Sequence, residues 1–145
     1  MMDPPSVLLE QSFLRAVADD DHEQHQLAAV EYRRLLAAYE AEEVLLVAVS
    51  DHLRPFAGLN RQGRFAPVDR LWVGFQHRRV ARRSAVADDF DLALTLVMAE
   101  RHRVRTVATL DPRFTGYDLT VVPEPATWAG ITGLVLGLFA WWRRR

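Results

Sequence analysis

The hydrophobic residues of this chain fall into short continuous runs that are separated by polar segments. Four of these runs are bounded by turn residues: residues 7–9, 44–49, 104–110 and 119–122. Short apolar runs of this kind are typical of strands buried on both faces of a sheet. The pattern therefore predicts four buried strands.

The segments between the runs show helical spacing. A short helix is expected over residues 13–18. A second helix is expected to begin at the polar break of residues 19–22, because apolar residues then recur at spacings of four, three and four: Ala28, Tyr32, Leu35 and Tyr39. Ser50 is a candidate helix N-cap, and another helix is expected from residue 88 to 102. Residues 54–83 hold two prolines and three glycines and predict loops around one or two short helices, although the apolar residues 71–75 must pack somewhere.

Strands that alternate with helices predict an α/β protein, a three-layer α/β/α sandwich with a central parallel sheet. The chain has 145 residues, of which 50% are hydrophobic and 26% charged, so one folded domain is expected and disorder of most of the chain is excluded. It has no cysteine, which excludes disulfides, thiolate nucleophiles and zinc–cysteine sites. Any metal must bind to oxygen or imidazole.

Acidic residues follow three of the predicted strands. Glu10 and Asp111 come directly after their strands, and Asp51 comes one residue later; Asp88, Asp89 and Asp91 precede a helix and could supply a fourth acid. The carboxyl ends of parallel strands share one edge, so these side chains should converge there. Clustered carboxylates repel one another unless a cation such as Mg²⁺ or Mn²⁺ neutralises them, and such an ion can activate water against a phosphodiester. The alternative is that they are ordinary turn and cap residues.

These residues carry a resemblance to the PIN-domain ribonucleases, in particular to the VapC-like toxins of toxin–antitoxin modules. Residues 99–114 resemble the family's last helix, its last strand and a Thr-x-Asp turn, and residues 7–14 are similar to its opening strand. The resemblance covers residues 6–123 and implies a Mg²⁺-dependent endoribonuclease with RNA as substrate and an acidic antitoxin as partner.

Carried over by position, the resemblance implies that Glu10, Asp51, Asp91 and Asp111 are the four acids of the site. Glu10, Asp91 and Asp111 would hold Mg²⁺ or Mn²⁺, while Asp51 and Asp111 would orient water and Thr109 would support the site by hydrogen bonding. There are two departures from the family pattern. Glu10 stands where the family has Asp, and counting back from Glu100 places Leu92 rather than Asp91 at the third acid. A second hypothesis is therefore a PIN-fold binding module that has lost catalysis.

The charge distribution adds a candidate binding surface. The net charge is −1, but residues 54–83 hold eight arginines and one acid. Together with Phe65, Trp72 and Phe75, this segment could bind RNA, or an acidic antitoxin; a solvated face with aromatic side chains in the core is the alternative. His22 and His25 resemble a metal pair, but we interpret them as surface histidines because no further ligands lie nearby in the sequence.

The C-terminal residues form a second pattern. Residues 126–142 are uncharged and end in two tryptophans followed by three arginines. With the preceding Pro123-Glu124-Pro125, they resemble a PEP-CTERM sorting tail and predict an apolar helix that contacts a membrane, or one that packs on the domain or on a second copy in a homodimer. We therefore expect a nuclease domain over residues 1–123 and a tail over residues 124–145. The start of the sequence lacks the pattern of a secretion signal, so a cytoplasmic location is expected.

Overall fold

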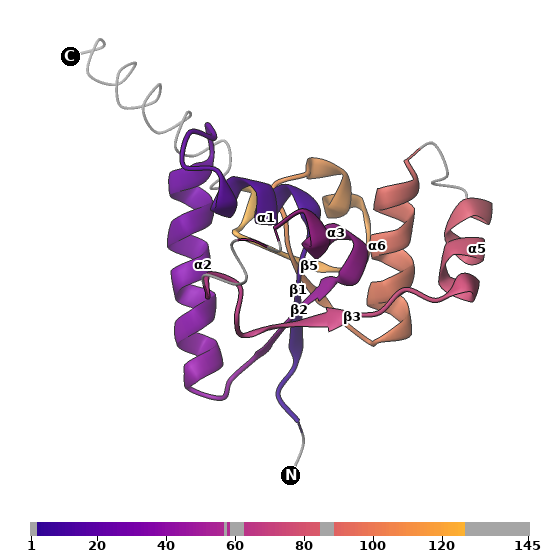
Figure 1. Ribbon diagram of the computed structural model, residues 1–145, viewed down its shortest axis with the longest axis horizontal. Helices are drawn as coiled ribbons and strands as arrows, with labels where there is room; N and C mark the ends of the chain where they lie inside the picture. Colours follow the sequence, from indigo (N-terminus) through magenta and orange to yellow (C-terminus); the bar gives the residue numbers. More distant parts are fainter. Residues whose placement is uncertain (1–2, 57, 59–62, 85–88, 127–145) are drawn as a thin grey trace.

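The computed structural model describes residues 3–56, 58, 63–84 and 89–126 of the chain. These residues form a five-stranded parallel sheet with the strand order β3-β2-β1-β4-β5, seen nearly edge-on in the centre of Figure 1. The strands are β1 (Ser6–Leu9), β2 (Leu45–Val49), β3 (Val68–Leu71), β4 (Thr106–Ala108) and β5 (Thr120–Val122). The predicted parallel sheet is therefore confirmed.

Helices cover both faces of the sheet (Figure 1). Helices α1 (Gln11–Ala18) and α2 (His25–Glu40) lie on one face, and α6 (Phe90–Arg101) lies on the other with α5 (Phe75–Arg83) outside it. Alternate strand residues point to opposite faces, because side chains in a strand have a period of two. Val7 and Leu9 belong to the core under α1 and α2, whereas Leu8 belongs to the core under α6. The predicted three-layer α/β/α architecture is confirmed.

Short helical turns follow the strands at one edge of the sheet. Helix α1 begins two residues after β1, α3 (Ser50–Leu53) follows β2 directly and continues into the 3₁₀ turn η1 (Arg54–Phe56), and η2 (Pro112–Gly116) follows β4. In the parallel register Leu9 lies beside Ala108, so β1 and β4 end at the same level. The residues that come next in the chain are therefore brought together at this edge.

The strand β3 is not predicted by the sequence pattern. Its sequence is Val-Asp-Arg-Leu, in which only the two outer residues are buried. Because β3 is an edge strand, its two charged residues can face solvent, and the continuous apolar run that identifies an inner strand is missing. The expectation that the apolar residues of 71–75 pack somewhere in the fold is wrong for two of them: Leu71 is buried, but Trp72 and Phe75 are 69% and 72% exposed.

The predicted apolar tail lies almost wholly outside the described residues, since the description ends at residue 126. The predicted homodimer and membrane contacts of residues 126–142 therefore stay predictions, as does the domain boundary at residue 123. Among the helices that the structure does describe, none is both long enough and apolar enough to span a bilayer.

Candidate active site

A pocket of about 160 Å³ opens where β1 and β4 end, beside the first turn of α6. Its described lining holds four acidic side chains, two arginines and four other residues: Glu10, Asp89, Asp91 and Asp111; Arg15 and Arg113; Gln11, Ser12, Leu92 and Phe114. Three of the predicted site residues, Glu10, Asp91 and Asp111, are thus brought to one pocket. The acids outnumber the arginines, so the pocket is negatively charged when all of these groups are ionised.

Glu10 is buried and acts as the N-cap of α1. Its carboxylate accepts hydrogen bonds from the Ser12 amide at 3.0 Å, from Ser12 Oγ at 2.5 Å and from Thr109 Oγ1 at 2.6 Å. A buried carboxylate needs such donors, because burial without hydrogen bonds or a counter-charge is costly. Glu10 is therefore firmly held at the pocket wall.

The hydroxyls of Ser12 and Thr109 join the ends of the two strands. Ser12 Oγ accepts a hydrogen bond from the Leu110 amide at 2.9 Å, and Thr109 Oγ1 accepts one from the Asp111 amide at 3.0 Å. Thr109 is fully buried. The supporting role that the sequence resemblance implied for Thr109 thus has a geometric basis: its hydroxyl contacts Glu10 on one side and the Asp111 backbone on the other.

Arg113 pairs with two of the pocket acids. Its guanidinium donates to Asp111 at 2.6 Å through Nη2 and at 3.1 Å through Nε, and its Nη1 lies 2.8 Å from Asp89 Oδ2. The hydrogen bonds from Arg113 hold the pKa of Asp111 below its usual value. The pKa of Asp89 is also lowered, first by the hydrogen bond from the Leu92 amide, which Asp89 caps, and then by Arg113. In turn, the two carboxylates raise the pKa of Arg113.

Asp91 is the pocket aspartate with the most exposed side chain, at 57%, compared with 34% for Asp89 and 18% for Asp111. Its Oδ1 lies 3.1 Å from Nε2 of His52, a buried residue of α3. An ionised carboxylate can only accept, so the proton of this hydrogen bond is on Nε2. The other ring nitrogen, Nδ1, is buried and has no hydrogen-bond partner among the described residues. His52 therefore fixes Asp91 from the side of α3.

Asp51 does not line this pocket in the described structure. Its carboxylate lies 3.1 Å from Arg78 of α5 and 3.5 Å from Arg54. The structure thus places Asp51 in a separate set of ion pairs, one residue before His52. Asp88, another candidate for the fourth acid, lies outside the described residues.

The acidic side chains of the pocket supply carboxylate oxygens, the ligands that Mg²⁺ and Mn²⁺ prefer. However, no three acidic or histidine side chains of the described chain come together as a metal-binding group. The cation that contacts Asp89 and Asp111 in this arrangement is the guanidinium of Arg113. The donor chemistry fits a hard divalent ion, which would have to replace Arg113 at these carboxylates.

Several of these contacts escape prediction from the sequence. Asp89 is predicted only as one member of an acidic group, although an Asp directly before an apolar run is a typical N-cap signal. Arg113, Ser12 and His52 follow no spacing rule, because their contacts depend on which strand ends meet. The other metal candidates, His22 and His25, stabilise the connection between α1 and α2: His22 Nδ1 accepts from the Gln24 amide at 3.0 Å, and His25 Nδ1 lies 2.7 Å from the Ala16 carbonyl oxygen.

Comparisons with known proteins show a likeness in fold to solved structures. No protein-family model matches the chain, and no curated protein matches it. Among solved structures, the chain is similar to the crystal structure of VapC20 from Mycobacterium tuberculosis, a toxin that cleaves the sarcin–ricin loop. The two are 14% identical with a TM-score of 0.57, and the match covers 79% of this chain and 98% of VapC20. At this identity the likeness concerns the fold alone, and the chain therefore has a PIN-like α/β fold of the kind found in a VapC toxin.

Proposed function

We propose that this protein is an endoribonuclease that hydrolyses RNA phosphodiester bonds at the pocket between β1, β4 and α6. The observation that carries the proposal is the convergence of Glu10, Asp89, Asp91 and Asp111 on one pocket at the carboxyl edge of a parallel sheet. Ligand sites of open α/β sheets occupy this edge. The shared fold with an RNA-cleaving toxin supports the choice of RNA as substrate.

The charge of the pocket supports a proposal that a cation takes part. Four carboxylates and two guanidiniums leave the ionised pocket with an excess of negative charge, which would repel an RNA phosphate. We propose Mg²⁺ or Mn²⁺ as that cation, with Glu10, Asp91 and Asp111 as ligands and Asp89 beside them. When bound, the ion would supply an activated water for attack on phosphorus.

The residues of the chain have separate parts in this proposal. Ser12 and Thr109 hold the carboxylate of Glu10, and His52 holds Asp91. Arg113 contacts Asp89 and Asp111 before a metal binds; once released, its planar guanidinium can bind a phosphate with two parallel hydrogen bonds. In this proposal Asp51, which the resemblance implies would orient water, instead pairs with Arg78 and ties α5 to α3.

The proposal is tested by RNA cleavage with the purified full chain. We expect Mg²⁺- or Mn²⁺-dependent cleavage that a chelator stops, and that falls by about 100-fold or more in Asp111→Asn, because an amide is a poor ligand for these ions. The matched control is Asp118→Asn, the same substitution at an exposed position outside the pocket lining. Cleavage that Asp111→Asn leaves unchanged would remove this pocket as the site.

We further propose that the protein is a toxin of a toxin–antitoxin module, that it acts in the cytoplasm and that its partner is an acidic antitoxin. The support is the fold likeness to a VapC toxin. Production of the chain in bacteria should then arrest growth, and co-production of a small acidic protein encoded beside it should restore growth. An arrest that Asp111→Asn leaves intact would contradict this assignment.

A second candidate function is a binding module without catalysis. It is favoured by the ion pairs of Arg113, by the burial of Glu10 as a helix cap and by the extra methylene of Glu10 relative to the family's Asp. This candidate predicts that wild-type protein cleaves no RNA and shows no heat of Mn²⁺ binding. Its proposed membrane tether, residues 124–145, would be supported if the protein partitions into detergent only when these residues are present.

A further inference from the structure

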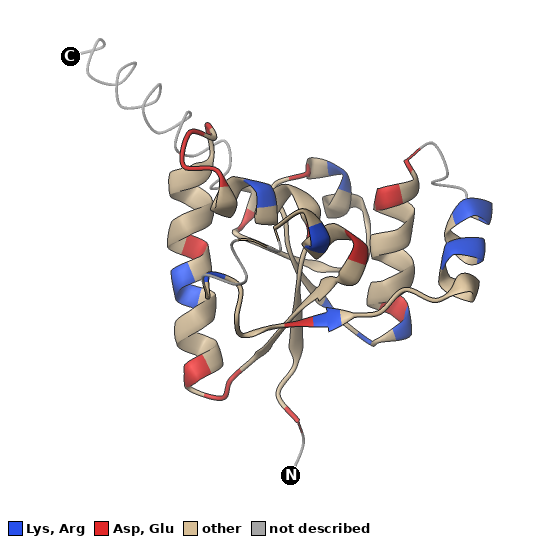
Figure 2. Cartoon of the chain, in the orientation of Figure 1, with Lys and Arg blue, Asp and Glu red and all other residues tan. Residues whose placement is uncertain are grey.

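Helix α5 presents a basic surface on the outside of the molecule. Its sequence, Phe-Gln-His-Arg-Arg-Val-Ala-Arg-Arg, contains four arginines and no acid. All nine residues of α5 are described, and of these only Ala81 is buried. Figure 2 shows α5 as a helix with blue segments on the outer side of α6. Arg78 pairs with Asp51, while Arg79, Arg82 and Arg83 are exposed.

Two aromatic side chains stand on the segment that leads into this helix. Trp72 directly follows β3 and is 69% exposed, and Phe75 begins α5 and is 72% exposed. They are three residues apart, so their Cα atoms lie within roughly 10 Å of each other. Exposed apolar side chains that gather in one patch are typical of interaction sites. The guanidinium of Arg70 lies 5.8 Å from the centre of the Trp72 ring, which places a positive charge beside one aromatic ring.

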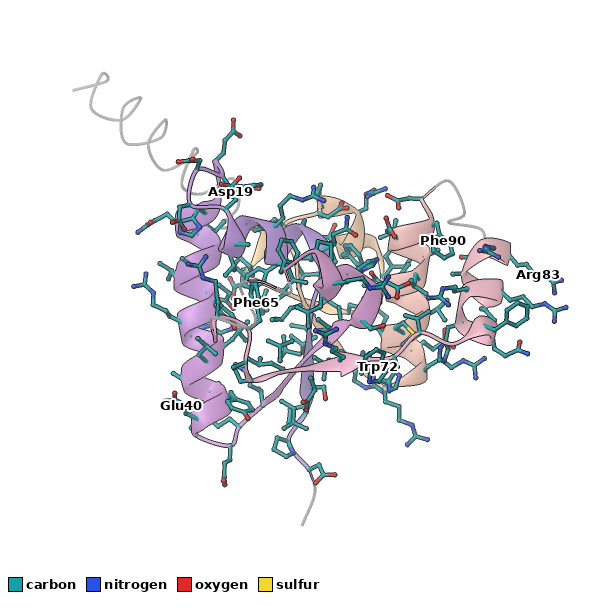
Figure 3. The ribbon with its side chains drawn as sticks, in the orientation of Figure 1. Asp19, Glu40, Phe65, Trp72, Arg83 and Phe90 are labelled. Carbon is teal, nitrogen blue, oxygen red and sulfur yellow. The ribbon has the colours of Figure 1, made fainter. Side chains whose placement is uncertain are left out.

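We propose that this β3–α5 surface, formed by Arg70, Trp72, Phe75, Arg79, Arg82 and Arg83, binds single-stranded RNA. Exposed rings stack on bases and arginines pair with phosphates, the combination that single-stranded nucleic acid sites use. The inference deepens the proposed function and rests on it for the choice of RNA, but the residues are separate from the acidic pocket. Figure 3 shows Trp72 at the end of β3 and Arg83 on the far side of α5, so the surface runs outward from the sheet.

A chain of contacts connects this surface to the pocket. Arg78 of α5 binds Asp51, the next residue is His52, and His52 contacts Asp91 in the pocket wall. Three of the six exposed residues of α5 are arginines, two are the apolar Phe75 and Val80, and none is acidic; the excess of positive charge favours a polyanion as the partner.

The test is fluorescence anisotropy of a labelled single-stranded RNA of about ten nucleotides, a length within the site sizes known for such surfaces. Binding to the full chain is measured in chelator at several stated salt concentrations. We expect Trp72→Ala and Phe75→Ala each to weaken binding by about fivefold or more, since each removes a stacking platform. Arg79→Gln and Arg83→Gln should each reduce the salt slope by about 0.7. Tyr39→Ala and Arg33→Gln, exposed residues of α2, are the matched controls.

Two results would overturn the inference. One is an affinity for RNA of the Trp72 and Phe75 variants that equals that of wild type. The other is displacement of the RNA by an acidic peptide that binds this surface more tightly than RNA does, because the surface would then be a site for a protein partner. Failure of this inference is distinct from failure of the proposed function. If the Trp72 and Phe75 variants bind RNA normally while Asp111→Asn loses cleavage, only the proposed RNA-binding surface is rejected. If these variants lose binding but the wild-type protein cleaves no RNA, only the proposed nuclease activity is rejected.

Discussion

At the scale of single residues, the pocket is organised by a few hydrogen bonds that pass between strand ends. Glu10 and Asp111 are 101 positions apart in sequence, yet Thr109 contacts the carboxylate of one and the amide of the other. Both contacts use the same hydroxyl oxygen. The placement of the acids therefore depends on a buried side chain that carries no charge.

We predict that Thr109→Val lowers the free energy of unfolding by about 1 to 3 kcal/mol, because it keeps the side-chain shape and deprives the buried carboxylate of Glu10 of one donor. Thr109→Ser retains the hydroxyl and should cost less. Urea denaturation of the three proteins measures the difference. Equal stability of Thr109→Val and wild type would show that this hydroxyl does not hold the site.

Arg113 gives the pocket a dependence on pH. Its contacts help to lower the pKa of both Asp111 and Asp89 in the folded protein. Groups with lowered pKa stabilise the fold above their unfolded pKa, about 3.9 for Asp, and this contribution is lost as the pH falls through the lower folded value. We predict that wild type resists urea better than Arg113→Gln above about pH 5 and that the difference shrinks below about pH 4. A difference in urea midpoint that stays constant down to about pH 2 would contradict these ion pairs.

The acids of the pocket could be predicted from the sequence because a carboxylate directly after a buried parallel strand must lie at the carboxyl edge of the sheet. Glu10 and Asp111 follow from this rule applied to the predicted strands 7–9 and 104–110, Asp91 follows from its place at a helix start, and all three share one pocket. Asp51 comes two residues after β2, nearer to its strand than Asp111 is to β4, yet in the turn of α3 its side chain meets Arg78 instead. That difference depends on the position of α5, which no local pattern indicates.

At the scale of elements, the three inner strands and the edge strand β5 could be predicted, and the edge strand β3 could not. The strands β1, β2 and β4 have continuous apolar runs because helices cover them on both faces. β3 pairs on one side with β2 and carries Asp69 and Arg70 at its centre. The hydrogen bonds to β2 determine its conformation, and such long-range pairing leaves no periodic signal in a four-residue segment.

Helix α2 is tied to the segment before β3 by Tyr32. Its hydroxyl donates to the Arg64 carbonyl at 2.6 Å, and its ring lies 5.7 Å from the buried ring of Phe65. Burial raises the pKa of Tyr32 to about 12. A raised pKa favours the neutral phenol, so its contribution is complete below pH 10 and is lost as the pH rises towards 12.

We predict that Tyr32→Phe lowers the free energy of unfolding by about 1 kcal/mol at neutral pH, because the Arg64 carbonyl loses its donor. The loss of stability between about pH 10 and 12 should also be smaller in this variant. Tyr39→Phe, at a position that is 36% exposed, is the control. Chemical denaturation at about pH 7 and about pH 11 measures both effects; a Tyr32→Phe variant as stable as Tyr39→Phe would show that this contact does not stabilise the fold.

At the scale of the whole molecule, the near-neutral net charge combines surfaces of opposite sign. The pocket carries an excess of acids, and α5 carries four arginines. The contact of Arg78 with Asp51 ties α5 to α3, whose His52 contacts Asp91 of the pocket. An enzyme that binds an RNA strand and cleaves it with a metal ion needs both kinds of surface.

We propose that water attacks an RNA phosphate at the acidic pocket and that the 3′-oxygen is the leaving group. A new P–O bond then forms, the bond to the 3′-oxygen breaks, and the products carry a 5′-phosphate and a 3′-hydroxyl. The most direct test is to determine the ends of RNA treated with wild type and with Asp111→Asn in Mg²⁺ or Mn²⁺. We predict 5′-phosphate and 3′-hydroxyl ends from wild type and uncut RNA from the variant. Ends with a 2′,3′-cyclic phosphate, or RNA left uncut by wild type, would contradict the proposal.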